Sequence, residues 1–143
     1  MFINKTAALH TSQIKVRFYD TDLSSVVFFT NYQKWFDSIA LIEFLEGLGI
    51  SLKKLHNEGL DMTLVSTAFS YKVSLTVDDL ADVSIEEIKV GSKSLQFSGS
   101  VYKHDTGELV AGGQAVYVFV DRKTHKAIYI PEKIKKILSK QNT

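Results

Sequence analysis

Between residues 62 and 121 the sequence holds four stretches of strand-forming residues, separated from one another by turns. Residues 62–75 are rich in Val, Thr, Ser, Phe and Tyr, whereas residues 80–90 and 93–102 alternate apolar and polar side chains. Residues 108–121 form the last stretch. Because short turns separate these stretches, they predict an antiparallel sheet whose strands are joined by hairpins.

An antiparallel sheet with one apolar face needs another element to cover that face. Residues 31–48 form the only helical pattern that is long and apolar enough, with Tyr32, Trp35 and Phe36 at helical spacing. A helix of about 18 residues would span roughly 27 Å. We therefore expect an α+β fold, in which a curved antiparallel sheet of about five strands wraps around one long central helix. Residues 13–19 would give the first strand.

The remaining segments predict smaller features. Residues 1–12 have no clear period and predict a loose arm, and residues 52–57 favour a short second helix. Pro131 suits the first position of a C-terminal helix. The Gly112-Gly113 pair inside the last strand indicates a bulge or a close approach of another backbone. Without repeats or linkers, residues 1–143 are expected to form a single domain.

Composition excludes several classes of protein. A hydrophobic share of 45% with 23% charged residues is typical of a soluble globular protein, and no apolar run approaches membrane-spanning length. The net charge of +1 gives no reason to expect nucleic acid as a partner. The absence of cysteine excludes disulfides and thiolate catalysis and favours a cytoplasmic location. The four histidines are scattered without ligand spacing, so we expect no metal site.

Residues 16–36 carry the strongest functional signal. A strand leads into the acidic turn Asp20-Thr21-Asp22, and a short apolar bridge then leads into the long helix. A carboxylate just before a helix N-terminus lies near unpaired backbone N–H groups and the positive end of the helix dipole. Such donors stabilise an oxygen that becomes negative, which suits hydrolysis of an activated acyl group. Asp20 should point away from Asp22 and be structural.

The segment from Arg17 to Trp35, R-F-Y-D-T-D-L-S-S-V-V-F-F-T-N-Y-Q-K-W, resembles the signature of hotdog-fold acyl-CoA thioesterases of the 4-hydroxybenzoyl-CoA thioesterase type. Related bacterial thioesterases associated with the Tol-Pal system share it. The likeness extends weakly along nearly the whole chain. It implies hydrolysis of an acyl-CoA to free acid and CoA, with no metal or redox cofactor. It also implies a homodimer or homotetramer with active sites at the subunit boundary.

The resemblance implies a role for three residues. Asp22 matches the catalytic carboxylate, which acts as nucleophile or general base, and the backbone N–H of Phe29 matches the oxyanion donor. Lys93 matches a basic residue that meets the CoA phosphates. Two positions depart from the family pattern: Ser25 stands where members usually carry glycine, and Thr30 where some carry histidine.

Each of these residues also has an ordinary structural interpretation. Asp22 could simply make a hydrogen bond within its turn, and Lys93 could be a solvated lysine. Asp37, on the helix, could bind a polar acyl group such as a ring hydroxyl. It could equally pair with Lys34 or Lys53, which is the interpretation we favour.

Other functions remain open at this point. A hotdog domain could bind acyl-CoA or an acyl carrier protein without hydrolysing it, or could act as a dehydratase or hydratase. The last two activities rely on a histidine working with an acid, and no histidine lies near Asp22 in the sequence. In a third interpretation the acidic turn is structural and the acyl site lies elsewhere. Release of thiol from acyl-CoA would distinguish these possibilities.

Overall fold

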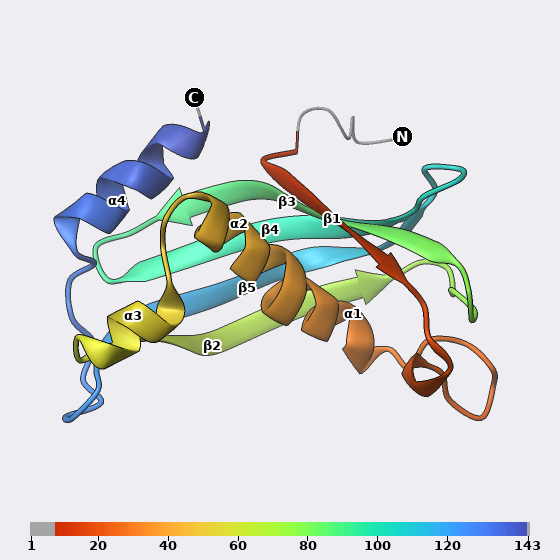
Figure 1. The fold of residues 1–143 in the computed structure, drawn as a ribbon, viewed down its shortest axis with the longest axis horizontal. Coiled ribbons are helices and arrows are strands. Elements are labelled where there is room, and N and C mark those ends of the chain that lie inside the picture. Colours follow the sequence, from red (N-terminus) through yellow and green to blue (C-terminus); the bar gives the residue numbers. More distant parts are fainter. Residues whose placement is uncertain (1–7, 143) are drawn as a thin grey trace.

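A five-stranded antiparallel sheet forms the framework of the protein, and a helical segment crosses one of its faces (Figure 1). The computed structural model describes residues 8–142. The strands run in the order β1-β3-β4-β5-β2, and each neighbouring pair is antiparallel. Their bounds are β1 (His10–Lys15), β2 (Leu60–Tyr71), β3 (Leu80–Val90), β4 (Ser94–Lys103) and β5 (Leu109–Asp121). The predicted α+β class and antiparallel sheet are confirmed.

The helical segment that covers the sheet has three successive parts. These are α1 (Thr30–Trp35), the π-helical turn η3 (Phe36–Ala40) and α2 (Leu41–Gly47). The backbone stays right-handed helical at both joins. The segment therefore occupies almost the predicted range, but it is not one uninterrupted α-helix, because a wider π turn lies in its middle.

The core lies between this segment and the sheet. Phe36, Leu41 and Leu45 are almost completely buried on the helical side, and Phe97 and Phe119 are buried on the sheet side. Burying one such side chain contributes about 1.5–3 kcal/mol to stability. This packing fixes the position of the helical segment, and hence of its N-terminus, on the sheet.

The connection between β2 and β3 differs from the prediction. β2 pairs with β5, so residues 72–79 cross from one side of the sheet to the other instead of making a hairpin. Leu75 in this crossover is fully buried. Its carbonyl accepts from the amide of Val27 at 2.9 Å, and its amide donates to the Tyr32 hydroxyl at 3.3 Å. These hydrogen bonds hold the crossover against the start of α1. Strand periodicity does not indicate such contacts.

The first strand begins and ends earlier than predicted. β1 begins at His10, inside the expected arm, and it ends at Lys15 rather than residue 19. Residues 1–7 of that arm lie outside the described part. Phe18–Asp20 form a 3-10 turn, η2, because the Asp20 carboxylate accepts from the Arg17 amide at 2.8 Å and bends the chain.

Several smaller predictions can be compared directly. The helix α3 (Leu52–Asn57) has its predicted bounds. Pro131 is the N-cap of α4 (Glu132–Ser139), one position earlier than expected. A Cβ atom on Gly113 would lie 1.9 Å from the Ala68 carbonyl oxygen, which confirms the close backbone approach. Register shifts lie near the glycine pair but not at it: one is in the partner strand β2, between Leu64 and Ser66, and one is in β5 at Val110, opposite the Val101–Tyr102 step of β4.

Candidate active site

The acidic loop, residues 20–28, is closed by backbone hydrogen bonds at the N-terminus of α1. The Asp22 amide donates to the Val26 carbonyl, and the Phe28 amide donates to the Asp20 carbonyl, both at 2.9 Å. The Asn31 side chain, in the first turn of α1, donates to the same Asp20 carbonyl at 2.9 Å. The loop is therefore held directly against the start of the helix.

The two aspartates of this loop have different environments. Asp20 is buried and its carboxylate caps the η2 turn, so its role is structural, as expected. Asp22 is exposed, and its Oδ1 accepts from the Ser24 amide at 2.8 Å. Among residues 8–142 no other side-chain hydrogen bond or ion pair to Asp22 is present, so its second carboxylate oxygen is accessible to a substrate or a water molecule.

Phe29 is the residue immediately before α1. Its backbone has right-handed helical angles, and its carbonyl accepts from the Tyr32 amide at 3.3 Å. Within the described residues its amide donates no hydrogen bond. An unpaired amide at a helix N-terminus can donate to an anionic oxygen, and the helix dipole favours negative charge there.

Large apolar side chains on and beside the acidic loop are exposed to solvent. Phe18 and Tyr19 are each 84% exposed, Leu23 is fully exposed, and Phe29 is 53% exposed. The Phe29 ring packs against Phe28 and Tyr71, with ring centroids 5.1 and 5.8 Å apart. Contiguous exposed apolar groups mark surfaces that contact another molecule or subunit.

Lys93 does not lie beside the acidic loop of its own chain. It occupies the β3–β4 turn, where its ammonium lies 5.0 Å from the centre of the Tyr129 ring. Its carbonyl accepts from Phe119, which pairs with Met62 near the beginning of β2. Phe29 packs on Tyr71, at the end of β2. At about 3.3 Å per residue, Met62 and Tyr71 lie roughly 30 Å apart along β2. The β3–β4 turn, which carries Lys93, and the start of α1, next to Phe29, therefore lie at opposite ends of the sheet (Figure 1).

A polar pair that sequence reasoning missed lies between the helical segment and the sheet. Asp37, in η3, accepts a hydrogen bond from the hydroxyl of Tyr117 in β5, so the expected pairing with Lys34 or Lys53 was wrong. Burial and this hydrogen bond raise the pKa of Tyr117, which keeps its phenol protonated as a donor. The sequence gives no sign of the pair, because 80 positions separate the two residues.

This pair lines two adjoining hollows between the helical segment and strands β2 and β5. Their volumes are about 220 and 270 Å³, and both are lined by Asp37, Ser38, Leu64 and Tyr117. We call them together the lateral groove. The rest of its lining is mostly apolar and includes Phe36, Leu41, Met62 and Phe69.

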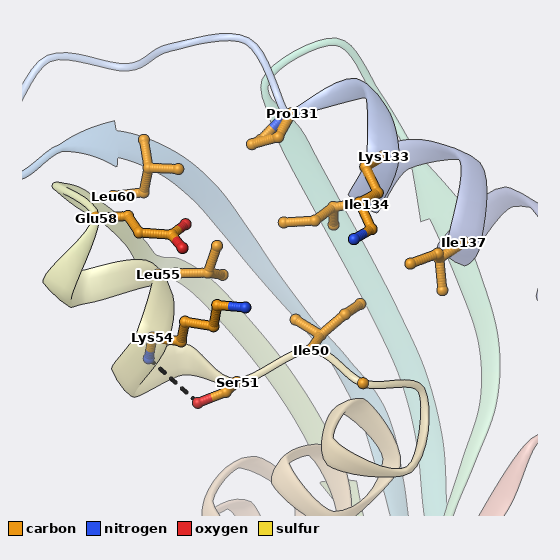
Figure 2. A pocket seen from close by; sticks show the side chains of 11 residues that line it. Ile50, Ser51, Lys54, Leu55, Glu58, Leu60, Pro131, Lys133, Ile134 and Ile137 are labelled. Atoms are coloured by element: carbon orange, nitrogen blue, oxygen red, sulfur yellow. Dashed lines mark hydrogen bonds between the residues drawn. The ribbon is translucent and has the colours of Figure 1, made fainter.

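A separate cavity of about 200 Å³ lies between α3 and α4 (Figure 2). Ile50, Leu55 and Ile134 supply apolar lining, and the charged ends of Lys54 and Lys133 point into the space between the two helices. It lies near the beginning of β2, away from the acidic loop. We therefore do not include it in the candidate site.

Residues 8–142 contain neither a metal-binding cluster nor a helix that could cross a membrane. No group of three or more histidine, aspartate or glutamate side chains is arranged to hold a metal ion. No helix in that range has the length and apolar character needed to span a membrane.

Comparisons with known proteins point to thioesterases. The family model described as "Thioesterase-like superfamily" matches residues 16–138. A putative esterase of Aquifex aeolicus strain VF5 is 30% identical over 124 residues, which cover 87% of this chain and 93% of that protein. A 1,4-dihydroxy-2-naphthoyl-CoA thioesterase from Synechocystis shares the fold, with a TM-score of 0.84 and 18% identity over 91% of this chain and 95% of that one.

The structure of a third similar protein was solved in complex with CoA. It comes from Staphylococcus aureus and shares the fold with a TM-score of 0.84 and 19% identity. The match covers 92% of this chain and 82% of that one. At this identity the likeness concerns the fold, which is the hotdog fold that residues 17–36 led us to expect.

Proposed function

This chain belongs to the thioesterase-like superfamily, and we propose that it hydrolyses acyl-CoA thioesters to the free acid and CoA at the acidic loop. The observation that supports this most directly is that the accessible Asp22 carboxylate lies on the loop held against the start of α1, while the amide of Phe29, just before α1, has no hydrogen-bond acceptor among residues 8–142. The complex of a structurally similar protein with CoA supports CoA as the carrier.

The proposed chemistry uses both groups. The Phe29 N–H and the helix dipole hold the thioester carbonyl oxygen and stabilise the negative charge that it gains in the tetrahedral intermediate. Asp22 acts in one of two ways. It either attacks the carbonyl carbon, expelling the CoA thiolate and forming an anhydride that water hydrolyses, or it takes a proton from a water molecule that attacks directly.

Replacing Asp22 tests this proposal. Asp22→Asn keeps the turn hydrogen bond but removes the charge, so we expect the rate of thiol release from a panel of acyl-CoAs to fall by about 10²-fold or more. Asp105→Asn, in an exposed turn between β4 and β5, is the matched control and should keep the full rate. An Asp22→Asn protein with unchanged rates would contradict the assignment. Tight CoA binding without thiol release by the unchanged chain would instead favour a binding domain.

A second copy of the chain completes the proposed site. β2 is a 12-residue strand at the edge of the sheet, and its side chains are mostly exposed. Edge strands of this kind present unpaired N–H and C=O groups that pair readily with another strand. We propose an antiparallel homodimer through β2, in which the beginning of one β2 lies beside the end of the other.

This arrangement gives Lys93 a role that it cannot have within one chain. Lys93 lies at the end of the sheet where β2 begins, and Phe29 lies where β2 ends. Antiparallel pairing brings Lys93 of one subunit toward the acidic loop of the other. There its ammonium could reach the CoA phosphates, which a lysine binds as a point charge.

A further inference from the structure

The cavity between α3 and α4 has the two kinds of surface that an amphiphilic ligand requires. Leu55 and Ile134 extend toward each other from opposite helices, and a space of about 200 Å³ separates them (Figure 2). Protein cores contain few voids larger than a water molecule, so a lined space of this size is available to a ligand. Its apolar lining consists of Ile50, Leu55, Leu60, Pro131, Ile134 and Ile137.

Three charged side chains line the same cavity. The ammonium groups of Lys54 and Lys133 point into the space between the helices, and Glu58 lines it as well (Figure 2). No ion pair involves any of the three among residues 8–142. Two positive charges and one negative charge leave a local excess of positive charge, which an anion would neutralise.

The volume of the cavity limits the size of that anion. At roughly 30 Å³ per heavy atom, the space holds about six or seven heavy atoms. A carboxylic acid with a tail of about five carbons meets this limit, because the tail fills the apolar part and the carboxylate stays beside the two lysines.

CoA is the other anion to consider, because the cavity lies at the same end of the sheet as Lys93. The amide of Ile130, two residues before α4, donates to the Ser92 carbonyl in the β3–β4 turn at 2.9 Å. An adenine ring alone, with its ten heavy atoms, needs roughly 300 Å³ by the same measure. A phosphate group has no tail to cover the apolar lining. The size and the lining of the cavity therefore both favour a simple carboxylate.

From these observations we propose that the cavity between α3 and α4 binds a short-chain carboxylic acid. The carboxylate lies between Lys54 and Lys133, and the tail packs against the apolar lining. Because the acid contacts both helices, its binding stabilises the folded chain. The site uses neither Asp22 nor Phe29, so this inference is independent of the proposed hydrolysis.

NMR of the full chain, labelled at the isoleucine δ1 methyl groups, tests the site directly. Ile50, Ile134 and Ile137 report from its lining. Titration with hexanoate should shift these signals to saturation. Acetate has the charge with hardly any tail, and hexanol has the tail without the charge. We expect each of the two to bind at least about tenfold more weakly than hexanoate.

Neighbouring lysines on the two helices give matched variants. Lys54→Gln combined with Lys133→Gln removes both charges and should weaken hexanoate binding about tenfold, while the affinity for hexanol changes by less than about twofold. Lys53→Gln combined with Lys136→Gln alters exposed lysines of the same two helices outside the cavity lining. This control should keep the full affinity for hexanoate.

The possible outcomes are separable. Hexanoate that leaves the signals of Ile50, Ile134 and Ile137 unchanged would overturn the inference, and so would equal affinities for hexanoate and hexanol. Full hexanoate affinity in the variant without Lys54 and Lys133 would overturn it too. Shifts with CoA but none with hexanoate would assign the cavity to CoA instead. A protein that binds hexanoate here but releases no thiol from acyl-CoA would contradict only the proposed hydrolysis.

Discussion

Ser25 has a backbone conformation that glycine adopts more easily. Its φ is +64°, and its amide donates to the Asp22 carbonyl at 2.9 Å, so the acidic loop depends on this left-handed residue. A residue with a Cβ atom loses roughly 1 kcal/mol or more in that region. The sequence resemblance identified the departure from glycine, and the structure supplies its physical meaning.

Ser25→Gly should therefore stabilise the protein. We expect the free energy of unfolding to rise by roughly 0.5–1 kcal/mol, because relief of the left-handed conformation exceeds the entropy that a more flexible glycine adds to the unfolded chain. Denaturant unfolding monitored by circular dichroism would measure the change. Ser24→Gly is the control, since Ser24 has no positive φ, and it should be neutral or destabilising. A loss of stability in Ser25→Gly would contradict this explanation.

The candidate site could be predicted only where its residues are close in sequence. Asp22 and Phe29 lie seven positions apart on one turn-to-helix segment, so local patterns suffice to suggest them. The Asp37–Tyr117 pair depends on which strand lies beneath the helix, which periodicity does not specify. The roles of Asp22, Phe29 and Lys93 remain predictions until the variants are measured.

At the scale of elements, a close contact between η3 and the sheet constrains the position of the helical segment. A Cβ atom on Gly99 in β4 would lie 2.4 Å from a ring carbon of Phe36 and 2.0 Å from the Ser84 carbonyl oxygen. The absence of a side chain at Gly99 therefore lets Phe36 lie directly on the sheet.

Gly99→Ala should be strongly destabilising for this reason. Neither the β3 backbone nor the buried Phe36 ring can move freely, so we expect the free energy of unfolding to fall by about 2–3 kcal/mol, as in other overpacked cores. Gly47→Ala is the control, because a Cβ atom there meets nothing within 4 Å and alanine favours the helix. Equal stabilities of the two variants in chemical denaturation would show that the close approach is not a real constraint.

The elements themselves were predicted better than their connections. Strand β3 and helix α3 have their predicted bounds because each is marked by alternation or by a cap together with a stop residue. The β2–β3 crossover was missed because the Asp78-Asp79 turn resembles a hairpin turn in sequence. Its course is instead determined by the burial of Leu75 against the start of α1.

At the scale of the whole molecule, two exposed apolar regions lie along or at the end of β2. Leu64 and Val65 are exposed on the strand, and Phe18, Tyr19 and Leu23 are exposed around the acidic loop. In the proposed antiparallel dimer the free edge of β2 pairs with its symmetry mate, and each acidic loop comes near the partner's Lys93. A single interface thus accounts for the exposed edge, for part of the exposed loop surface and for the distance between Lys93 and Asp22.

A charge at the centre of this edge should separate the subunits. Val65 is 56% exposed at the bulge of β2, and lysine on an edge strand opposes strand pairing. We expect light scattering after size-exclusion chromatography to give a dimer mass for the unchanged protein and a monomer mass for Val65→Lys. Thiol release from acyl-CoA should fall with the dimer, because the partner's phosphate contact is lost. Val77→Lys, at an exposed position in the crossover, should remain dimeric. A monomeric unchanged protein with full activity would exclude a site shared between subunits and leave Lys93 without a role in CoA binding.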